Sequence, residues 1–175
     1  MVLIRIRRNL DSWYFLPQTI ALVLVAASVC LVVLAGLAVE LFGSPIERDL
    51  RDAVATSLPN AWLACTPGIC HEPDAAAPAF NVTHDRLRTA LGAVVHAEPR
   101  TRRIHVSKDA RRLTYTQQSA TFGFTDRIYV QFFPLERGRS AIAISSEAQV
   151  GLYDFGVNRA RVERWLAELG KRVQE

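Results

Sequence analysis

Residues Ile20–Val39 form a run of twenty residues in which Ser28 is the only polar type. An α-helix rises about 1.5 Å per residue, so such a run makes a helix roughly 30 Å long, about the thickness of a bilayer's hydrocarbon core. A helix that packs on a soluble core keeps a polar face, and this run has none. The run therefore predicts a transmembrane helix over residues 18–42, after a short N-terminal segment of residues 1–17.

The residues around this run indicate its orientation. Three arginines, Arg5, Arg7 and Arg8, lie before it, whereas residues 43–58 contain only two. Basic residues are enriched on the cytoplasmic side of membrane helices. We therefore expect a cytoplasmic N-terminus in a bacterial inner membrane, with residues 43–175 forming a periplasmic domain.

Two further features bear on the anchor. Trp13, Tyr14 and Phe15 lie where aromatic residues mark a membrane interface. The alternative is a cleaved signal peptide, because Gly36-Leu37-Ala38 fits a small-x-small cleavage site. A signal peptide has an apolar core of roughly 7–15 residues, and this one is longer. The length favours an uncleaved anchor.

The charge of the remaining chain is mildly basic. Residues 43–175 hold 18 of the 21 basic and 15 of the 17 acidic residues, in a chain of net charge +4. Basic clusters occur at Arg100–Arg103 and Arg111–Arg112, without the denser stripe and interleaved aromatics typical of nucleic-acid binding. They are a solvated surface or a contact for an acidic partner or anionic lipid headgroups.

Two cysteines lie close together in a segment rich in proline and glycine. Cys65 and Cys70 can form a disulfide in an oxidising compartment, and this is the favoured interpretation. Because His71 follows directly, covalent c-type haem is an alternative, although four residues separate the cysteines where two are usual. A metal site of the same three residues is a further alternative. Cys30 lies within the apolar run.

The remaining pattern predicts an α+β domain, with an antiparallel β-sheet flanked by helices. Apolar residues recur at helical spacing in three segments, which are residues 45–58, 84–92 and 158–173. Residues 64–81, with several prolines, predict a loop. Strand-like composition marks five further segments, which are residues 94–97, 103–106, 112–118, 121–134 and 140–146.

The C-terminal part of the chain carries a specific motif. Phe124–Arg127 leads into a strand, and Gly151 is followed by Asp154-x-Gly156-x-Asn158-x-x-Arg161 at the start of the last helix. This arrangement resembles the bacterial and plastid family catalogued as domain of unknown function 1499. The likeness covers about residues 59–170, and it implies the family's fold and an envelope location. The family has no settled activity, so the resemblance implies no mechanism.

The motif has a physical interpretation of its own. Gly151 and Gly156 permit backbone conformations that other residues avoid. Asp154 and Asn158 can accept hydrogen bonds from the free amides of a helix start, where an anion is also stabilised. With Arg161, these residues are either a capped strand-to-helix connection or a site for an anion or headgroup.

No motif for catalysis is present. The chain lacks a glycine-rich phosphate loop, a Gly-x-Ser-x-Gly elbow and a His-Glu-x-x-His pair. We therefore expect a non-catalytic accessory or scaffold subunit of a larger membrane complex, such as one of electron-transfer or photosynthetic type, without a cofactor or bound metal. Alternatives are a domain that binds lipid or a small anion, and a haem carrier through Cys65, Cys70 and His71. Arginine and aromatic residues are enriched at interfaces, and the contact candidates of these types are Arg100, Arg102, Arg103, Phe132 and Phe133.

Overall fold

The computed structural model describes residues 15–42, 46–51, 53–55 and 58–174 of the chain. The chain divides into two compact units, Met1–Gly43 and Ser44–Glu175.

The first unit contains one long helix, α1 (Phe15–Phe42). All side chains over residues 20–34 are exposed, and Ser28 Oγ donates a hydrogen bond to Leu24 O at 2.8 Å within the helix. Among the residues that the structure describes, no helix is both long and apolar enough to cross a membrane. The residues used above to orient the run, Arg5, Arg7, Arg8, Trp13 and Tyr14, lie outside the described residues, as does the side chain of Phe15.

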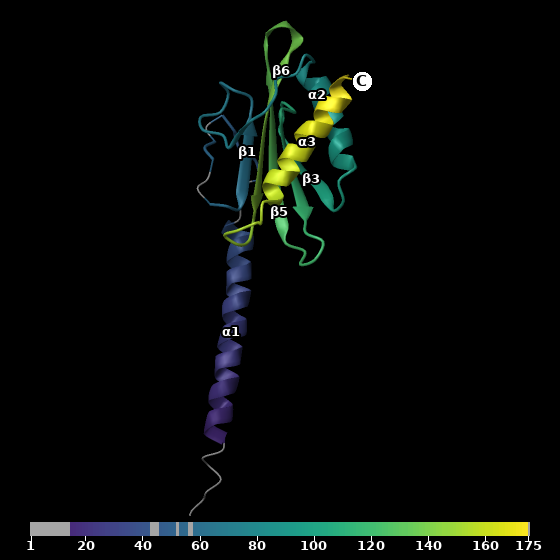
Figure 1. Ribbon diagram of the computed structural model, residues 1–175. Coiled ribbons are helices and arrows are strands. Elements are labelled where there is room, and N and C mark those ends of the chain that lie inside the picture. The colour runs from purple at the N-terminus through teal and green to yellow at the C-terminus, as the bar shows by residue number, and fades with distance from the viewer. Residues whose placement is uncertain (1–14, 43–45, 52, 56–57, 175) are drawn as a thin grey trace, which may run out of the picture. The chain divides into compact units, whose positions relative to one another are not determined.

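The second unit is an α+β domain built on a six-stranded sheet of order β2-β1-β6-β5-β4-β3 (Figure 1). Neighbouring strands are antiparallel, except that β1 and β2 run parallel. The sheet is therefore mixed rather than purely antiparallel as the sequence predicts. The strands are β1 (Ala61–Cys65), β2 (Ala75–Ala76), β3 (Thr101–Val106), β4 (Arg112–Gln118), β5 (Thr125–Pro134) and β6 (Ser140–Ala148).

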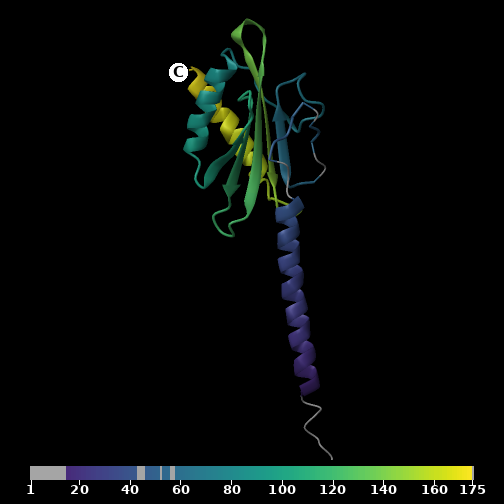
Figure 2. The ribbon, with the colours of Figure 1, turned by 180° about the vertical axis from the view of Figure 1, so that it is seen from behind.

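Two helices, α2 (His84–His96) and α3 (Val157–Gln174), lie together on one face of the sheet (Figures 1 and 2). Their apolar residues, at helical spacing, are buried against the strands. Trp165 is fully buried, and its ring meets Tyr115 of β4 edge-on with the ring centroids 5.9 Å apart. The helices predicted over 84–92 and 158–173 are thus present, and each is longer than predicted.

The opposite face of the sheet carries a second, smaller core. Alternation along β6 separates the two, because Ile142 and Ile144 point to the helices while Ala141 and Ala143 point to the other cluster. Leu50 and Cys65 complete the second cluster from preceding segments. Both faces of the central strands are therefore covered.

Several local predictions are wrong. The segment predicted as a helix over 45–58 is not helical in its described residues, since Leu50 is buried on the sheet and Val54 forms a bridge with Glu72. Of the apolar residues at four-residue spacing, only Leu50 is buried, whereas Ile46, Val54 and Leu58 are exposed, so the repeat does not mark the buried face of a helix. Residues 94–97 belong to α2 and its C-terminal cap, and the predicted loop over 64–81 contains β2.

Candidate interaction site

The two cysteines of the segment rich in proline and glycine form a disulfide. Cys65 and Cys70 are bonded, with their Cα atoms 6.1 Å apart, and this confirms the favoured sequence prediction. Both sulfurs are thereby used, so neither is free for a thioether bond to haem or for metal coordination. Within the described part of the chain, no group of three or more His, Cys, Asp or Glu residues could hold a metal ion.

The predicted contact residues separate into two sets. Arg100, Arg102 and Arg103 are exposed at the beginning of β3, the edge strand. Phe132 and Phe133 are instead in the core, 1% and 3% exposed, so their prediction as contact residues is wrong. Because β5 is a central strand covered on both faces, successive side chains enter the helix-side core and the opposite core respectively.

The turn before α3 is a capped connection. Gly151 and Gly156 have φ of +92° and +78°, a region that side chains disfavour. Asp154 Oδ1 accepts a hydrogen bond from Gly156 N at 2.9 Å, and Asp154 Oδ2 accepts one from Asn158 N at 2.8 Å. The Asp154 carboxylate therefore occupies the amides to which an external anion would bind. This favours a capped strand-to-helix connection over an anion site.

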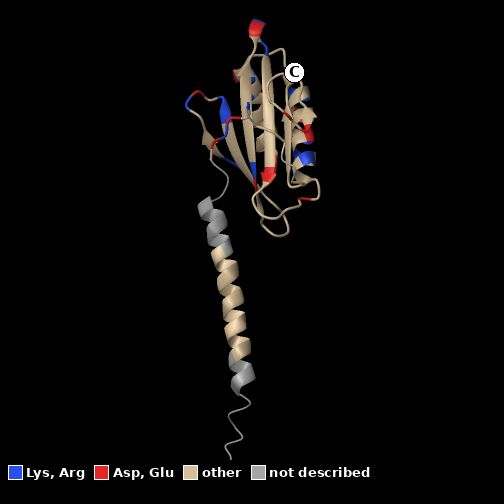
Figure 3. Ribbon diagram, turned by 90° about the vertical axis from the view of Figure 1, so that its left-hand side faces the viewer, with Lys and Arg blue, Asp and Glu red and all other residues tan. Residues whose placement is uncertain are grey.

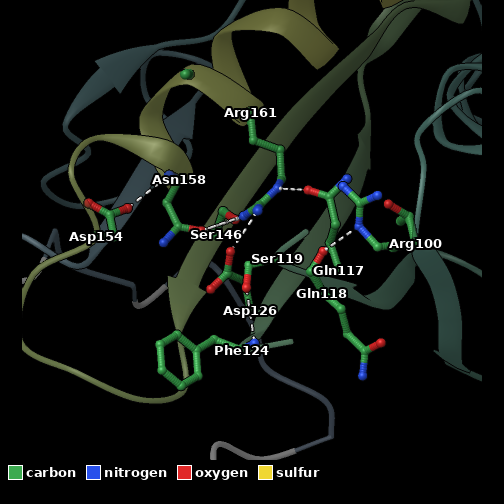
Figure 4. A network of polar contacts seen from close by, with 12 residues as sticks. Arg100, Gln117, Gln118, Ser119, Phe124, Asp126, Ser146, Asp154, Asn158 and Arg161 are labelled. Atoms are coloured by element: carbon green, nitrogen blue, oxygen red, sulfur yellow. Dashed lines mark hydrogen bonds and ion pairs between the residues drawn. The ribbon is translucent and has the colours of Figure 1, made fainter. Parts of the chain in front are cut away.

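Arg161 is the centre of a buried polar network behind this turn (Figure 4). Its Nη2 donates to Asp126 Oδ2 of β5 at 2.6 Å, and its Nε donates to Gln117 Oε1 of β4. Its Nη1 donates to Ser146 Oγ of β6 at 2.7 Å and to Asn158 Oδ1 of α3 at 2.5 Å. One guanidinium thus joins three strands and a helix.

The network satisfies groups that would be costly to bury alone. Asn158 is fully buried, and its Nδ2 donates to Asn60 O at 3.0 Å while its Oδ1 also accepts from Ser146 Oγ at 2.6 Å. The Arg161 side chain is 4% exposed and that of Asp126 is 13% exposed. Burial raises the pKa of Asp126, and the Arg161 guanidinium opposes that rise. Asn158 therefore acts inside the network and does not cap the helix.

A second ion pair extends the network toward the start of β3. Gln117 Nε2 donates to Glu98 Oε2 at 3.2 Å, and Arg164 donates to both oxygens of Glu98 at 2.9 Å. The hydrogen bond from Arg164 holds the pKa of Glu98 below its ordinary value. Bidentate contacts of this kind fix both the distance and the orientation of the carboxylate.

The network lies at the base of two loops that leave the same end of the sheet, opposite the β5–β6 hairpin (Figures 1 and 2). The β4–β5 loop enters β5 just before Asp126, and the β6–α3 loop leaves β6 just after its pairing partner Ala148. Gln149 N donates to Thr125 O at 3.2 Å, which joins the two loop bases directly. The Arg161 network therefore fixes both loops relative to the sheet.

These loops carry a cluster of exposed apolar side chains, here called the apolar tip. Phe155, Phe122 and Leu152 are 86%, 75% and 74% exposed. The phenyl rings of Phe122 and Phe124 stack with centroids 5.6 Å apart, and the rings of Tyr153 and Phe155 meet edge-on at 4.9 Å. Large exposed apolar clusters usually mark interaction sites. The members of the tip are Phe122, Phe124, Val150, Leu152, Tyr153 and Phe155 of the loops, together with Val157 at the start of α3.

The apolar tip is not among the residues predicted from the sequence, because residues 121–124 have the composition of a strand and the second loop coincides with the family motif. A signal was present in the composition. The loops comprise residues 119–124 and 149–156, and neither contains Lys or Arg in a chain that has 21 of them. In Figure 3 the loops at this end are mostly tan, the colour of uncharged residues.

Comparison with known families identifies the family of this chain. The family described as protein of unknown function (DUF1499) matches residues 49–169, more than half of the chain. The chain therefore belongs to this family, as the motif around Asp154 and Arg161 predicts. Among curated proteins, none gives a significant match.

Proposed function

We propose that this protein is a membrane-anchored, non-catalytic interaction module, an accessory subunit that stabilises a larger membrane complex. The membrane attachment is inferred from the apolar run Ile20–Val39. The basic residues before the run favour a cytoplasmic N-terminus and a periplasmic domain in a bacterial inner membrane. A complex of electron-transfer or photosynthetic type fits this location.

The observation that carries the interaction role is the arginine-bearing edge of the sheet. Arg102 and Arg103 are exposed on β3, and within the described residues neither forms an ion pair. Arg100 beside them donates from Nε to Gln118 O at 3.1 Å, which fixes its side chain against the sheet. Uncompensated guanidinium groups in this position are suited to carboxylates of a partner subunit.

The arrangement of polar groups also favours a non-catalytic role. Ser146, the hydroxyl nearest to Arg161, is fully buried and bonded to both Arg161 and Asn158. Asp126, the carboxylate in the same network, is paired with Arg161. Each group has a structural partner, and the network ties elements together rather than presenting a nucleophile or base to a cavity.

Two experiments test the proposal. Alkaline carbonate washing of membranes should leave the full-length protein in the pellet, and protease added to spheroplasts should cleave the domain. For the partner, a photo-crosslinking residue at Arg102 should give a discrete adduct with another membrane protein, and the same residue at Glu136 in the opposite hairpin should give none. Carbonate release, or a protein that stays monomeric without adducts after mild extraction, contradicts the proposal.

The charge dependence of that adduct provides the matched control. Arg102→Glu with Arg103→Glu should abolish it, because both guanidinium groups become like charges toward an acidic partner. Arg137→Glu, at an exposed residue of the opposite hairpin, should leave it unchanged. Equal adduct yields in both variants would show that the edge arginines do not carry the contact.

A further inference from the structure

We infer that the apolar tip is a lipid-binding surface that inserts its aromatic and aliphatic side chains into the interface of the bilayer. This inference rests on the proposed membrane attachment and assigns a different surface and a different partner from the arginine edge. Four features of the described residues support it.

The first feature is the composition of the tip. Exposed phenylalanine, leucine and tyrosine side chains occur on two adjacent loops, with Tyr153 and Phe155 in ring contact. Aromatic residues with one apolar and one polar end are typical of the membrane–water interface. The tip thus has the residue types that proteins use to enter this layer.

The second feature is the absence of outward charge in the two loops. Their only carboxylate is that of Asp154, and its two oxygens accept hydrogen bonds from the amides of Gly156 and Asn158. A protein interface of ordinary kind is enriched in arginine and rimmed by polar groups. The loops contain no Lys or Arg, so lipid suits them better than a protein surface.

The third feature is that hydrogen bonds within the protein pair several backbone groups of these loops. Ser119 N donates to Phe124 O at 2.8 Å, and Phe124 N donates to Ser119 Oγ at 3.0 Å. In the second loop, Gly151 O accepts from Asn60 Nδ2 at 2.8 Å and Asp154 N donates to Pro59 O at 3.2 Å. Polar backbone groups that are already paired reduce the cost of entering a medium poor in water.

The fourth feature is the rigid base. The Arg161 network fixes the bases of both loops, so the apolar side chains are presented together without further ordering of the strands. Preorganisation of this kind lowers the entropic cost of binding. The apolar run Ile20–Val39, which precedes the domain in the same chain, is the independent reason to expect a bilayer as the occupant.

The test uses full-length protein reconstituted into liposomes of neutral phospholipid without any other protein. Cys30→Ser removes the free thiol, and Phe155→Cys then carries an environment-sensitive fluorophore. We expect blue-shifted emission, with stronger quenching by lipids labelled near the headgroup than by lipids labelled near the chain end. The same fluorophore on Glu136→Cys, in the opposite hairpin, should remain in water and unquenched.

Two serine substitutions test which side chains carry the docking. In this reporter protein, Leu152→Ser and Phe122→Ser should each shift the docked–undocked equilibrium about tenfold toward the undocked state, as expected when a large apolar side chain no longer leaves water. Val106→Ser, at an exposed apolar residue of β3 outside the tip, should have no effect. These side chains are exposed, so circular dichroism should be unchanged in all three variants.

The outcomes separate this inference from the proposed function. If the protein does not co-float with the liposomes in a density gradient, the membrane attachment is contradicted, and so is the inference about the tip. Protein that floats while its label at position 155 stays in water overturns the tip inference alone. A label that is shielded in native membranes but not in pure lipid assigns the tip to a protein partner, which also overturns the inference and leaves the proposed function standing.

Discussion

Arg161 of α3 and Asp126 of β5 form a buried ion pair, with Nη2 and Oδ2 2.6 Å apart, directly below the two loops of the apolar tip. The pair does not stand alone, because the same guanidinium also donates to Gln117, Ser146 and Asn158. A buried charge is tolerated when its remaining donors and acceptors are satisfied. Arg161 therefore holds the ends of β4, β5 and β6 to the start of α3.

Arg161→Met should destabilise the domain strongly. The substitution keeps much of the side-chain volume but leaves the Asp126 carboxylate without its ion-pair partner and Gln117 Oε1 without its donor. Removing one member of a buried pair costs about 3 kcal/mol. Urea unfolding of the full-length protein in mild detergent, followed by tryptophan fluorescence, measures the loss. Arg161→Lys should recover only part of it, because one ammonium group cannot reach all four partners.

Arg159→Gln is the control for this prediction. Arg159 lies on the same helix, exposed, with its Nε 2.8 Å from Glu163 Oε1 one turn later. Exposed pairs of this kind contribute about 0.5 kcal/mol or less. Similar urea midpoints for the Arg161→Met and Arg159→Gln proteins would refute the central role of Arg161.

The pair of Glu98 and Arg164 should make stability depend on acid pH. The hydrogen bond from Arg164 lowers the pKa of Glu98 in the folded state below its ordinary value of 4.5. The associated stability is therefore fully present above that value and is lost as the pH falls through the lowered pKa. Urea midpoints measured from pH 7 to pH 3 should fall less steeply in Glu98→Gln than in the native protein. A parallel fall in both proteins would exclude Glu98 as a source of the acid sensitivity.

The disulfide should be detectable by thiol counting. The chain has three cysteines, and Cys30 is the free one. Alkylation of the unfolded, unreduced protein should add one group by mass, and alkylation after reduction should add three. Reduction should also lower the free energy of unfolding by about 2 kcal/mol, the chain-entropy value for so short a loop. Three alkylated cysteines before reduction would show that Cys65 and Cys70 are not bonded.

The sequence correctly predicted the helices and strands in which the local propensity of the residues agrees with their packing in the fold. Residues 112–118 form β4 with those bounds, and α3 was predicted to within one residue at each end, because its apolar repeat begins directly after the turn that Asp154 caps. The burial of Phe132 and Phe133, by contrast, could not be predicted from the sequence. A strand with both faces covered has a continuous apolar run, and nothing local tells it from an exposed aromatic surface.

The centre of the candidate site was predicted only in part. The motif indicated Asp154, Gly156, Asn158 and Arg161 as a unit, but their partners Gln117 and Asp126 come from strands far away in the sequence. Burial of Asn158 and Arg161 depends on those strands, so spacing alone suggested a capping role for Asn158. The apolar tip depends likewise on strand pairing, which brings two separate loops to one end of the sheet.

Asp154→Ala should weaken the start of α3 and loosen the loop that bears Tyr153 and Phe155. The aspartate accepts bonds from two amides, and loss of an N-cap acceptor costs about 1 kcal/mol. Thr83→Ala is the comparison at α2, where the hydroxyl accepts a single, longer bond of 3.4 Å from Arg86 N, so a smaller loss is expected. Hydrogen exchange in the full-length protein should rise at the amides of Gly156 and Asn158 in Asp154→Ala and stay unchanged there in Thr83→Ala. Unchanged exchange in both proteins would mean that other contacts, chiefly the Asn158 bond to Arg161, are enough to order the loop.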